Sequence, residues 1–452
     1  MLLKSRAKEE FNIEPIGSEQ MDKWITECAN IYQGNPSWLN EEDSIDTVNM
    51  GKTVCSEIAR LAMLGTSVAM EGSARAEWLQ KQINSIYDDL RHWVEYGCAY
   101  GTIILKPNGK NIDLYTYGQF EITHVSNGKI CGIVFHNQEK RGDKWYNRLE
   151  YHRYENDVYL ISNQCYVGDS PNDTKQKIDI KLTPWSHLTE EVGMDNVAEP
   201  LFGVLRMPQA NNIYLNSPYG LPVFSEAIQE LRDLDIAYSR NAKEILDSKR
   251  TVLVDDSLVI GSGYKVAQNP MAAKAAADRI GLPDMAKLVH GSGQETYYQE
   301  INPTLHTDAR MTGINALLSQ IGFKCGFSNG HFVFNEKSGM ITATEVESND
   351  RRTIQLINDV REKLKTCLNG LIYALDVFAT LYGLAPAGPY EAVYDYGDIT
   401  YNRDEDRARW WGYVQAGRVP AWKFFVLFEG MTEEEAKAMV AEAQPKTPVL
   451  FE

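Results

Sequence analysis

Residues 216–249 read NSPYGLPVFSEAIQELRDLDIAYSRNAKEILDSK, and this stretch decides most about the fold. Pro222 stands where a first helical turn tolerates proline. Apolar residues then recur every three or four positions, which predicts one helix that runs to about Lys249. The apolar positions are Phe224, Ala227, Ile228, Leu231, Leu234, Tyr238, Ala242 and Ile245.

The residues after Lys249 predict a short mixed region, a second helix, a loop and one long helix. Helical spacing stops at residue 250 and resumes only after residue 303. The predicted elements are, in order, a strand at 251–254, an Ala-rich helix from Asn269 to Gly281, a strand at 295–300, a helix through 311–321, a Gly-rich aromatic loop at 322–341 and a helix through 346–378.

The tail from residue 385 has its own turn signals. Gly417 and Pro420 are expected to break two helices. Thr432 and Glu435 have the spacing of a capping box, which predicts the start of a third helix. The tail is therefore expected to be a small helical part of the chain.

The residues before 216 predict three helices followed by an antiparallel sheet. The helical stripes occupy 18–32, a segment that ends near Gly65 and a segment that ends at Gly97. After Gly101 the hydrophobic period changes to two, with Asn-Gly and Gly-Asp turns between short runs, to about Leu182. A loop-rich stretch to Gly220 is expected next. Separate runs of helices and antiparallel strands predict the α+β class.

Length and composition indicate a globular protein. The 452 residues suffice for two or more domains, and 43% hydrophobic with 24% charged residues is ordinary globular usage. Residues 368–384 come nearest to a membrane span, but an aspartate at a bilayer centre costs about 3 kcal/mol, and Asp376 lies in this run. We expect a buried amphipathic helix and no membrane association. The first ten residues do not look like a signal peptide, so a cytoplasmic product is expected.

Cysteine spacing and net charge narrow the function classes further. The seven cysteines include no CxxC pair, which fits neither a disulfide framework nor a zinc site, so reduced core thiols are expected. The formal net charge of −17 has the wrong sign for a protein that grips DNA by its phosphates. Any contact with nucleic acid should be loose or confined to small patches.

Two motifs suggest chemistry, but their surroundings argue against it. Gly51-Lys52-Thr53 looks like the end of a P-loop, yet Asp46 stands where the first glycine is required, and the segment has helical periodicity. Glu150 and His152 would share one face of a strand as half of a metal site. We interpret them as a satisfied surface pair. We therefore expect no enzyme activity, no cofactor and no metal.

The order of elements and several local sequences resemble the portal proteins of long-tailed phages that infect Gram-positive bacteria. Asn216-Ser-Pro-Tyr-Gly220 and the helix after it are similar to the family's entry into its first stem helix. Phe332-Val-Phe-Asn335, Gly339-Met340 and Thr342-Ala-Thr-Glu-Val346 resemble its tunnel loop running into a long helix. Arg148-Leu-Glu150 with His152 resembles a recurrent sequence motif of the family's β-rich wing.

The resemblance covers about Trp38 to Glu442 and implies a phage portal fold within the α+β class. Such a fold has a helical and β-rich wing, a two-helix stem, a small α/β clip, a tunnel loop with a long helix, and a helical crown. Transferred to this sequence, the resemblance implies the following parts: the wing at 1–220, stem helices at 221–249 and 304–322, the clip at 250–303, the tunnel loop region at 323–341, the long wing helix at 342–383 and the crown at 384–452.

The resemblance also implies a function and its partners. The chain would form a homo-oligomeric ring, a dodecamer, through which double-stranded DNA passes at one capsid vertex during genome packaging and ejection. The implied partners are the terminase large subunit, a head-tail connector or adaptor, and the major capsid and scaffolding proteins. The implied location is the virion, with the host cytoplasm during assembly.

Three sets of residues are expected to act in such a channel. Lys337 is the one basic residue between Lys324 and Arg351, and it would give each loop tip a positive contact with DNA. The tunnel loop set is Phe334, Asn335, Glu336, Lys337, Ser338 and Gly339; the stem set is Asp233, Arg240, Lys243, Asp308 and Arg310; the clip set is Asp255, Asp256, Tyr264, Lys265 and Tyr297. The apolar stripes at 224–245 and 343–381 are also expected to be buried partly by subunit packing.

Two other function classes stay open. A head-tail adaptor or neck protein would be structural and would never touch DNA. A DNA-packaging enzyme would require a Walker motif or an acidic metal cluster, and neither is visible in the sequence. A ring with an open pore would discriminate between these classes.

Overall fold

The computed structural model describes residues 2–39, 45–109, 111–174, 176–215, 217–248, 251–255, 286–289, 298–301, 304–334, 343–397, 403–429 and 431–443. The chain divides into two compact units. Unit 1 comprises Met1–Ala62 and Ala69–Val393, and unit 2 comprises Met63–Val68 and Tyr394–Glu452. Helices and mainly antiparallel strands occupy largely separate runs of the chain, so it belongs to the α+β class.

The largest sheet of unit 1 is antiparallel and arises from the region where period-two patterning was predicted. Its strand order is β4-β5-β6-β7-β8, and β9 also pairs with β7. Asn127 with Gly128, and Asn156 with Asp157, have positive φ in the tight turns that join neighbouring strands, which is why Asn-Gly and Asn-Asp suit these positions. The strands are β4 Phe120–Ser126, β5 Lys129–Arg141, β6 Lys144–Glu155, β7 Val158–Gly168, β8 Gln176–Ile178 and β9 Glu191–Met194.

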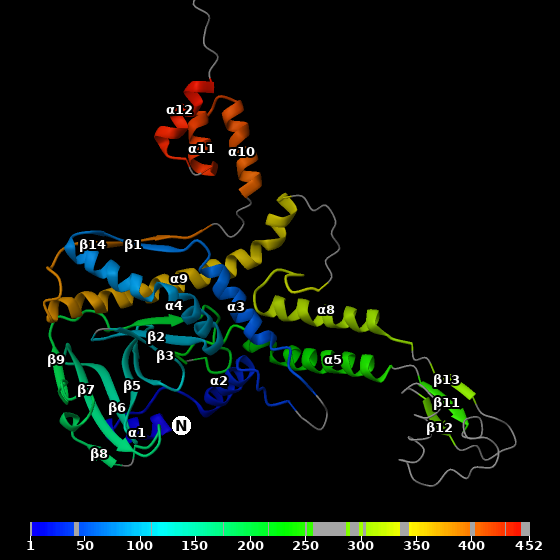
Figure 1. Ribbon diagram of the computed structural model, residues 1–452. Coiled ribbons are helices and arrows are strands. Elements are labelled where there is room, and N and C mark those ends of the chain that lie inside the picture. The colour runs from blue at the N-terminus through cyan, green and yellow to red at the C-terminus, as the bar shows by residue number, and fades with distance from the viewer. Residues whose placement is uncertain are drawn as a thin grey trace, which may run out of the picture. The chain divides into compact units, whose positions relative to one another are not determined.

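A smaller sheet, of order β10-β2-β3, packs between the large sheet and two long helices (Figure 1). Ile104 and Tyr115 of the small sheet share a core with Ile133 and Phe135 of the large one. Its β10 strand lies directly under the α9 helix, where the backbone at Gly203 approaches Cys367 too closely for any side chain. The strands are β2 Thr102–Asn108, β3 Asn111–Tyr115 and β10 Gly203–Arg206.

Helices complete the layers of unit 1. Helix α2 contributes Met21 and Ile25 to the core shared by the two sheets. Helix α1 covers the other face of the large sheet, where Ala7 packs with Val134 and Tyr166. The helices of this part are α1 Leu2–Phe11, α2 Glu19–Tyr32, α3 Met50–Ala62, α4 Ala74–Tyr100 and α9 Ala343–Leu381.

The helix predicted to end at Gly97 continues to Tyr100, so that prediction of its end is wrong. Gly97 lies inside α4 because Leu205 and Met207 pack closely over it, with a Cβ there only 2.9 Å from Leu205. The glycine that ends the helix is Gly101, whose φ of 77° is left-handed and whose amide bonds to the carbonyl of Gly97.

Other element boundaries also differ from the predictions. The stretch predicted as loop before Gly220 contains β9 and β10, each only four residues long, which is too short to show a period. Residues Ser225–Ala227 form a 3-10 turn, so α5 spans Ile228–Asp247 and Pro222 precedes it. Strands β12 Ala286–Val289 and β14 Tyr390–Asp395 were not predicted. The Ala-rich helix expected at 269–281 lies outside the described residues.

Unit 2 contains the three helices predicted for the tail. They are α10 Arg403–Gln415, α11 Ala421–Glu429 and α12 Glu433–Ala443. The capping box is present, since Glu435 N donates to the Thr432 hydroxyl and Thr432 N donates to the Glu435 carboxylate. Phe424 and Phe428 are buried at the centre of the three helices. Strand β14 pairs with β1, Ser67–Gly72.

Helix α9 carries the run that came nearest to a membrane span. Its part from Arg351 to Leu381 is long and apolar enough to cross a membrane by length and composition, a test that core helices also pass. Ile357, Val360 and Leu371 of this helix are fully buried inside unit 1. All seven cysteines are free thiols; six are buried and Cys131 is half-buried, so reduced core thiols were predicted correctly for six of them.

Candidate functional site

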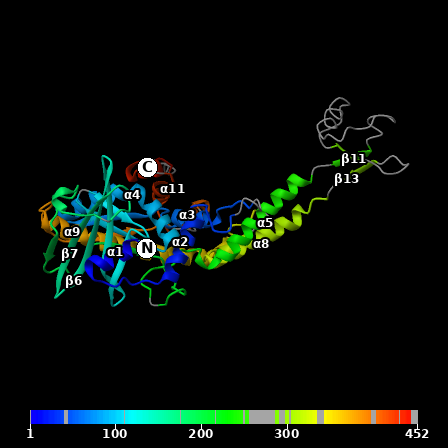
Figure 2. The ribbon, with the colours of Figure 1, turned by 90° about the horizontal axis from the view of Figure 1, so that it is seen from below.

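Helices α5 and α8, Thr307–Lys324, form an antiparallel hairpin whose members lie side by side in both views (Figures 1 and 2). Its contact face is apolar, with Leu231 and Leu234 of α5 and Ile314 and Leu318 of α8 buried. These are the positions that helical periodicity predicted. The hairpin therefore corresponds in sequence to the two predicted stem helices.

Two ion pairs join the helices near opposite ends of the hairpin. Lys324 Nζ lies 2.6 Å from the Glu230 carboxylate, and Arg310 pairs with Glu244. Gln320 adds a hydrogen bond of 3.3 Å to Glu230. The partners are fourteen residues apart in each helix, so the register of the hairpin is the same at both pairs. Such a hairpin is held as one rigid piece.

The five predicted stem residues do not all have the same environment in the structure. Asp233, Arg240, Lys243 and Asp308 are exposed on the hairpin. The Asp233 carboxylate accepts a bond of 3.1 Å from Gln229 of its own helix. Arg310 is half-buried in its pair with Glu244, so its charge already has a partner within the chain.

A three-stranded sheet, of order β12-β11-β13, lies in sequence between the two helices. Strand β11, Thr251–Asp255, pairs parallel with β12 and antiparallel with β13, Tyr298–Ile301. Asp255 is the last residue of β11, opposite Val289. The other predicted clip residues, Asp256, Tyr264, Lys265 and Tyr297, lie outside the described residues.

The predicted tunnel loop begins at a well-anchored segment. Phe334 N donates to Asn315 Oδ1 of α8 at 3.1 Å, while Phe334 as a whole is 59% exposed. Upstream, the Phe327 ring stacks with His331 and packs edge-on against Phe332. The remaining loop residues, Asn335, Glu336, Lys337, Ser338 and Gly339, lie outside the described residues.

The start of α9 is tied to the end of α8. The Arg352 guanidinium lies 3.8 Å from the centre of the Phe323 ring, and its Nη2 donates to the Phe323 carbonyl at 2.9 Å. Ser328 and Thr353 exchange hydrogen bonds through their backbone amides and hydroxyls. Both ends of the predicted loop are therefore fixed to the α8 and α9 helices.

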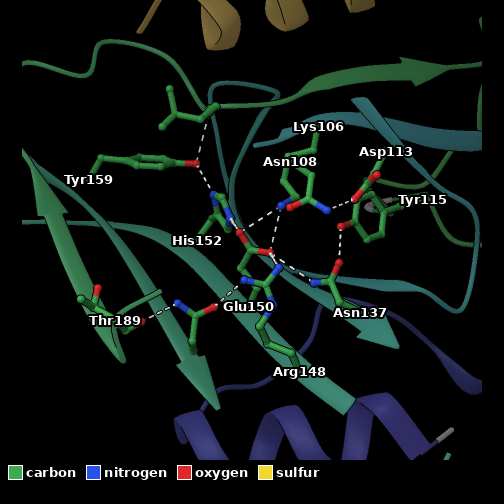
Figure 3. A network of polar contacts seen from close by, with 12 residues as sticks. Lys106, Asn108, Asp113, Tyr115, Asn137, Arg148, Glu150, His152, Tyr159 and Thr189 are labelled. Atoms are coloured by element: carbon green, nitrogen blue, oxygen red, sulfur yellow. Dashed lines mark hydrogen bonds and ion pairs between the residues drawn. The ribbon is translucent and has the colours of Figure 1, made fainter. Parts of the chain in front are cut away.

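The Arg148-Leu-Glu150 sequence with His152 forms a buried charge network in the large sheet (Figure 3). The Glu150 carboxylate accepts two bonds from Lys106 Nζ at 2.9 and 3.0 Å, one from Arg148 Nη2 at 2.9 Å and one from His152 Nε2 at 2.9 Å. Asn137 Nδ2 adds a bond of 3.2 Å. Each of these charged side chains is less than a tenth exposed.

This network corrects the prediction that Glu150 and His152 are a surface pair. Both side chains point into the layer between the two sheets, because β2 supplies the buried Lys106 opposite them. His152 Nδ1 lies 2.8 Å from the Tyr159 hydroxyl, and that hydroxyl accepts a hydrogen bond from Leu201 N. With a carboxylate at its other nitrogen, the His152 ring carries its proton on Nε2.

Burial and charge shift the pKa values of the network in known directions. Burial by itself would raise the pKa of Glu150, but the Arg148 and Lys106 charges outweigh it and hold that pKa well below its usual range. Burial lowers the pKa of His152 despite its bond to Glu150, and burial likewise lowers that of Lys106. Glu150 is thus held ionised inside a buried network, in which Arg148 Nε has no hydrogen-bond partner among the described residues.

Lys106 and Asp235 are the polar residues that sequence reasoning missed. Lys106 follows the run Thr102–Leu105 without a turn residue between them, which indicates that the strand continues through this lysine. Asp235 interrupts the apolar side of α5 next to Leu234. In both cases the hydrogen-bond partners come from distant parts of the chain. The local sequence therefore does not identify them.

The remaining predicted motif, Gly51-Lys52-Thr53, is helical in the structure. Gly51-Lys52-Thr53 lies in the first turn of α3, as its periodicity predicted, and Ile31 and Phe224 pack against Gly51. Across the part of the chain that the structure describes, no group of three or more His, Cys, Asp or Glu side chains could hold a metal ion.

Comparisons with known proteins are mostly negative. No protein-family model and no curated protein matches the chain. Among solved structures, one similar chain belongs to a structure described as "Virion of native gene transfer agent (GTA) particle". The similarity covers 92% of this chain and 95% of that chain, with 11% sequence identity and a TM-score of 0.44.

Proposed function

We propose that the chain is the subunit of a phage portal, a ring through which double-stranded DNA enters and leaves a capsid. The observation that carries the proposal is the order of elements that follows the large sheet. A rigid antiparallel hairpin encloses a small three-stranded sheet in sequence and is followed by an anchored loop and the 39-residue helix α9. This is the order that the resemblance to portal proteins implies.

In this proposal the hairpin is the stem, and the sheet of β11, β12 and β13 belongs to the clip. Unit 1 without these parts is the wing with its long helix, and the helices of unit 2 form the crown. Asp233, Arg240, Lys243 and Asp308 are the exposed stem charges that a channel would present to DNA. Arg310 holds the hairpin together instead.

The net charge of −17 for each chain suits a passive channel. Twelve copies would surround the duplex with roughly 200 negative charges, which offer DNA few deep binding minima. Lys337 on each tunnel loop would provide limited positive contacts that steer the duplex without stopping it. The chain itself would supply no catalysis, since the motor would be the terminase large subunit.

The proposed assembly is a homo-oligomeric ring, a dodecamer, at one vertex of the virion. Its further proposed partners are the head-tail connector or adaptor on the outside and the major capsid and scaffolding proteins around the wing. Assembly would take place in the host cytoplasm.

Negative-stain images of the purified chain, together with a Lys337→Glu variant, test this function. We expect closed rings with an open pore for both proteins, because one exposed loop charge contributes little to stability. Capsids with the variant should package or retain less DNA than wild type. The deficit should shrink at higher salt, as the screening length falls from roughly 10 Å toward 3 Å.

Three outcomes would contradict parts of the proposal. A chain that stays monomeric under capsid-assembly conditions is not a portal subunit. Rings that never associate with DNA in capsids would favour the head-tail adaptor. If Lys337→Glu capsids package full genomes at the normal rate in low salt, the loop charge has no role in transport.

A further inference from the structure

The connection between α2 and α3 crosses the α5 helix, about 190 residues away in sequence. We name its described residues, 36–39 and 45–48, the strap. The Asp235 carboxylate of α5 receives both ends: Trp38 Nε1 donates to Oδ2 at 2.9 Å and Val48 N donates to Oδ1 at 2.8 Å. One helical turn further on, the Ser239 hydroxyl accepts from Asp46 N at 2.9 Å and donates to the Asp46 carbonyl at 3.2 Å.

The donors that satisfy Asp235 are neutral groups of the strap. Besides Trp38 and Val48, the Thr47 side chain bonds to the carboxylate. Asp235 is only 3% exposed, and a buried carboxylate is costly unless its oxygens are hydrogen-bonded. The strap supplies those bonds, so strap and helix hold each other in place.

The attachment lies partway along the hairpin. Asp235 and Ser239 are seven and eleven residues from the start of α5, which is about 10 and 16 Å along its axis. Beyond Ser239 the side chains of Arg240, Lys243 and Leu246 are exposed. The hairpin itself resists bending, because ion pairs join α5 and α8 on both sides of this attachment.

We propose that Asp235 and Ser239 form a latch that sets the angle of the hairpin against the rest of unit 1. When the latch opens, the hairpin moves as one piece about the end where α5 begins and α8 ends, and it is held at one angle when the latch is closed. Both are positioning residues. The proposal concerns the chain by itself and does not depend on the proposed portal function.

Asp235→Asn tests the latch, because asparagine keeps the size of the side chain but presents an amide donor to donors of the strap. Hydrogen exchange of the full-length protein at one pH is the measurement. We expect the Val48 amide to exchange about 10- to 100-fold faster, since it loses its bond to a charged acceptor. The Asp46 amide, which bonds to Ser239, should also exchange faster as the strap loosens. Exchange in α4 and the large sheet should not change.

Asp233→Asn is the matched control, with the same substitution two residues away on the same helix but on an exposed side chain. It should leave strap exchange at the wild-type rate. Equal exchange at Val48 in both variants would overturn the latch, and so would faster exchange throughout unit 1 in Asp235→Asn. If Asp235→Asn does not fold, Ser239→Ala replaces it as the test. Faster exchange confined to the Asp46 amide supports the latch, and unchanged exchange at that amide overturns it.

Spin-label distances test the hinge separately from the local bonds. Nitroxides on Asp89→Cys of α4 and Ala316→Cys of α8, both exposed positions, report the hairpin angle in a Cys131→Ser background that leaves the six buried cysteines unlabelled. Asp235→Asn should broaden the distance distribution, and Asp233→Asn should not. Identical distributions in the two variants would show that the latch does not set the angle.

Discussion

At the scale of single residues, the buried network around Glu150 makes stability depend on pH. The pKa of His152 is below its ordinary value of 6.5 because the ring is buried. As the pH falls through about 6.5, the unfolded chain therefore takes up a proton that the folded chain does not. The stabilisation is fully present above pH 6.5 and is lost as the pH falls toward the folded pKa.

Thermal melts of wild type and His152→Gln between pH 7.5 and 5.5 measure this effect. We expect wild type to lose stability on the order of 1 kcal/mol more than the variant over this range, because glutamine keeps a donor for Glu150 but does not titrate. His187→Gln, on an exposed side chain, should follow wild type. Parallel curves for wild type and His152→Gln would mean that His152 is not protonated differently in the two states.

At the scale of elements, one backbone crossing joins α4, β2 and the segment before α5. Gly101 has a φ of 77°, and a Cβ there would lie 2.3 Å from the Gly220 carbonyl. Its carbonyl accepts from Met207 N, and Thr102 next to it accepts from Gly220 N. The crossing positions the chain that enters the hairpin, so neither glycine tolerates a side chain.

Gly101→Ala and Gly109→Ala separate the clash from the backbone strain. Both glycines have left-handed φ, but nothing lies within 4 Å of a Cβ at Gly109. In urea unfolding, Gly109→Ala should lose about 1–2 kcal/mol, the cost of that conformation for alanine. Gly101→Ala should lose clearly more or fail to fold. Equal losses would mean that the backbones at Gly101 and Gly220 separate easily.

At the scale of the whole molecule, the structure narrows where subunits are expected to pack. The α9 stripe from Leu356 to Ala379 is covered within one chain, so it needs no partner. On α5 three apolar residues at or beyond the strap's attachment are exposed: Tyr238 at 47%, Ile245 at 49% and Leu246 at 67%. The expectation of subunit packing therefore now rests on this end of α5.

Leu246→Glu tests this contact surface. A charge at a buried subunit contact should shift the assembly toward smaller species, as measured by light scattering on a sizing column. Ser85→Glu places the same charge on an exposed position of α4 and should leave the assembly unchanged. If Leu246→Glu assembles like wild type, this end of α5 is not a subunit contact.

The sequence by itself determined the elements whose periodicity extends over several turns or strands. It predicted α2, the α5 and α8 helices, α9 and the long strands β5, β6 and β7 of the large sheet, because regular burial of one face leaves a regular pattern. Short strands such as β10 and β12 leave no such pattern. Their pairing depends on partners elsewhere in the chain, so their existence could not be predicted locally.

The tertiary structure alone decided which polar residues come together. Lys106 and Glu150 are 44 residues apart, and Trp38 and Asp235 are 197 apart, and nothing in either local sequence specifies the partner. A charged side chain on a strand or helix is ordinarily solvated, which is why Glu150 and His152 were predicted at the surface. Only the packing of one layer on another removes the water and turns such residues into a buried network or a latch.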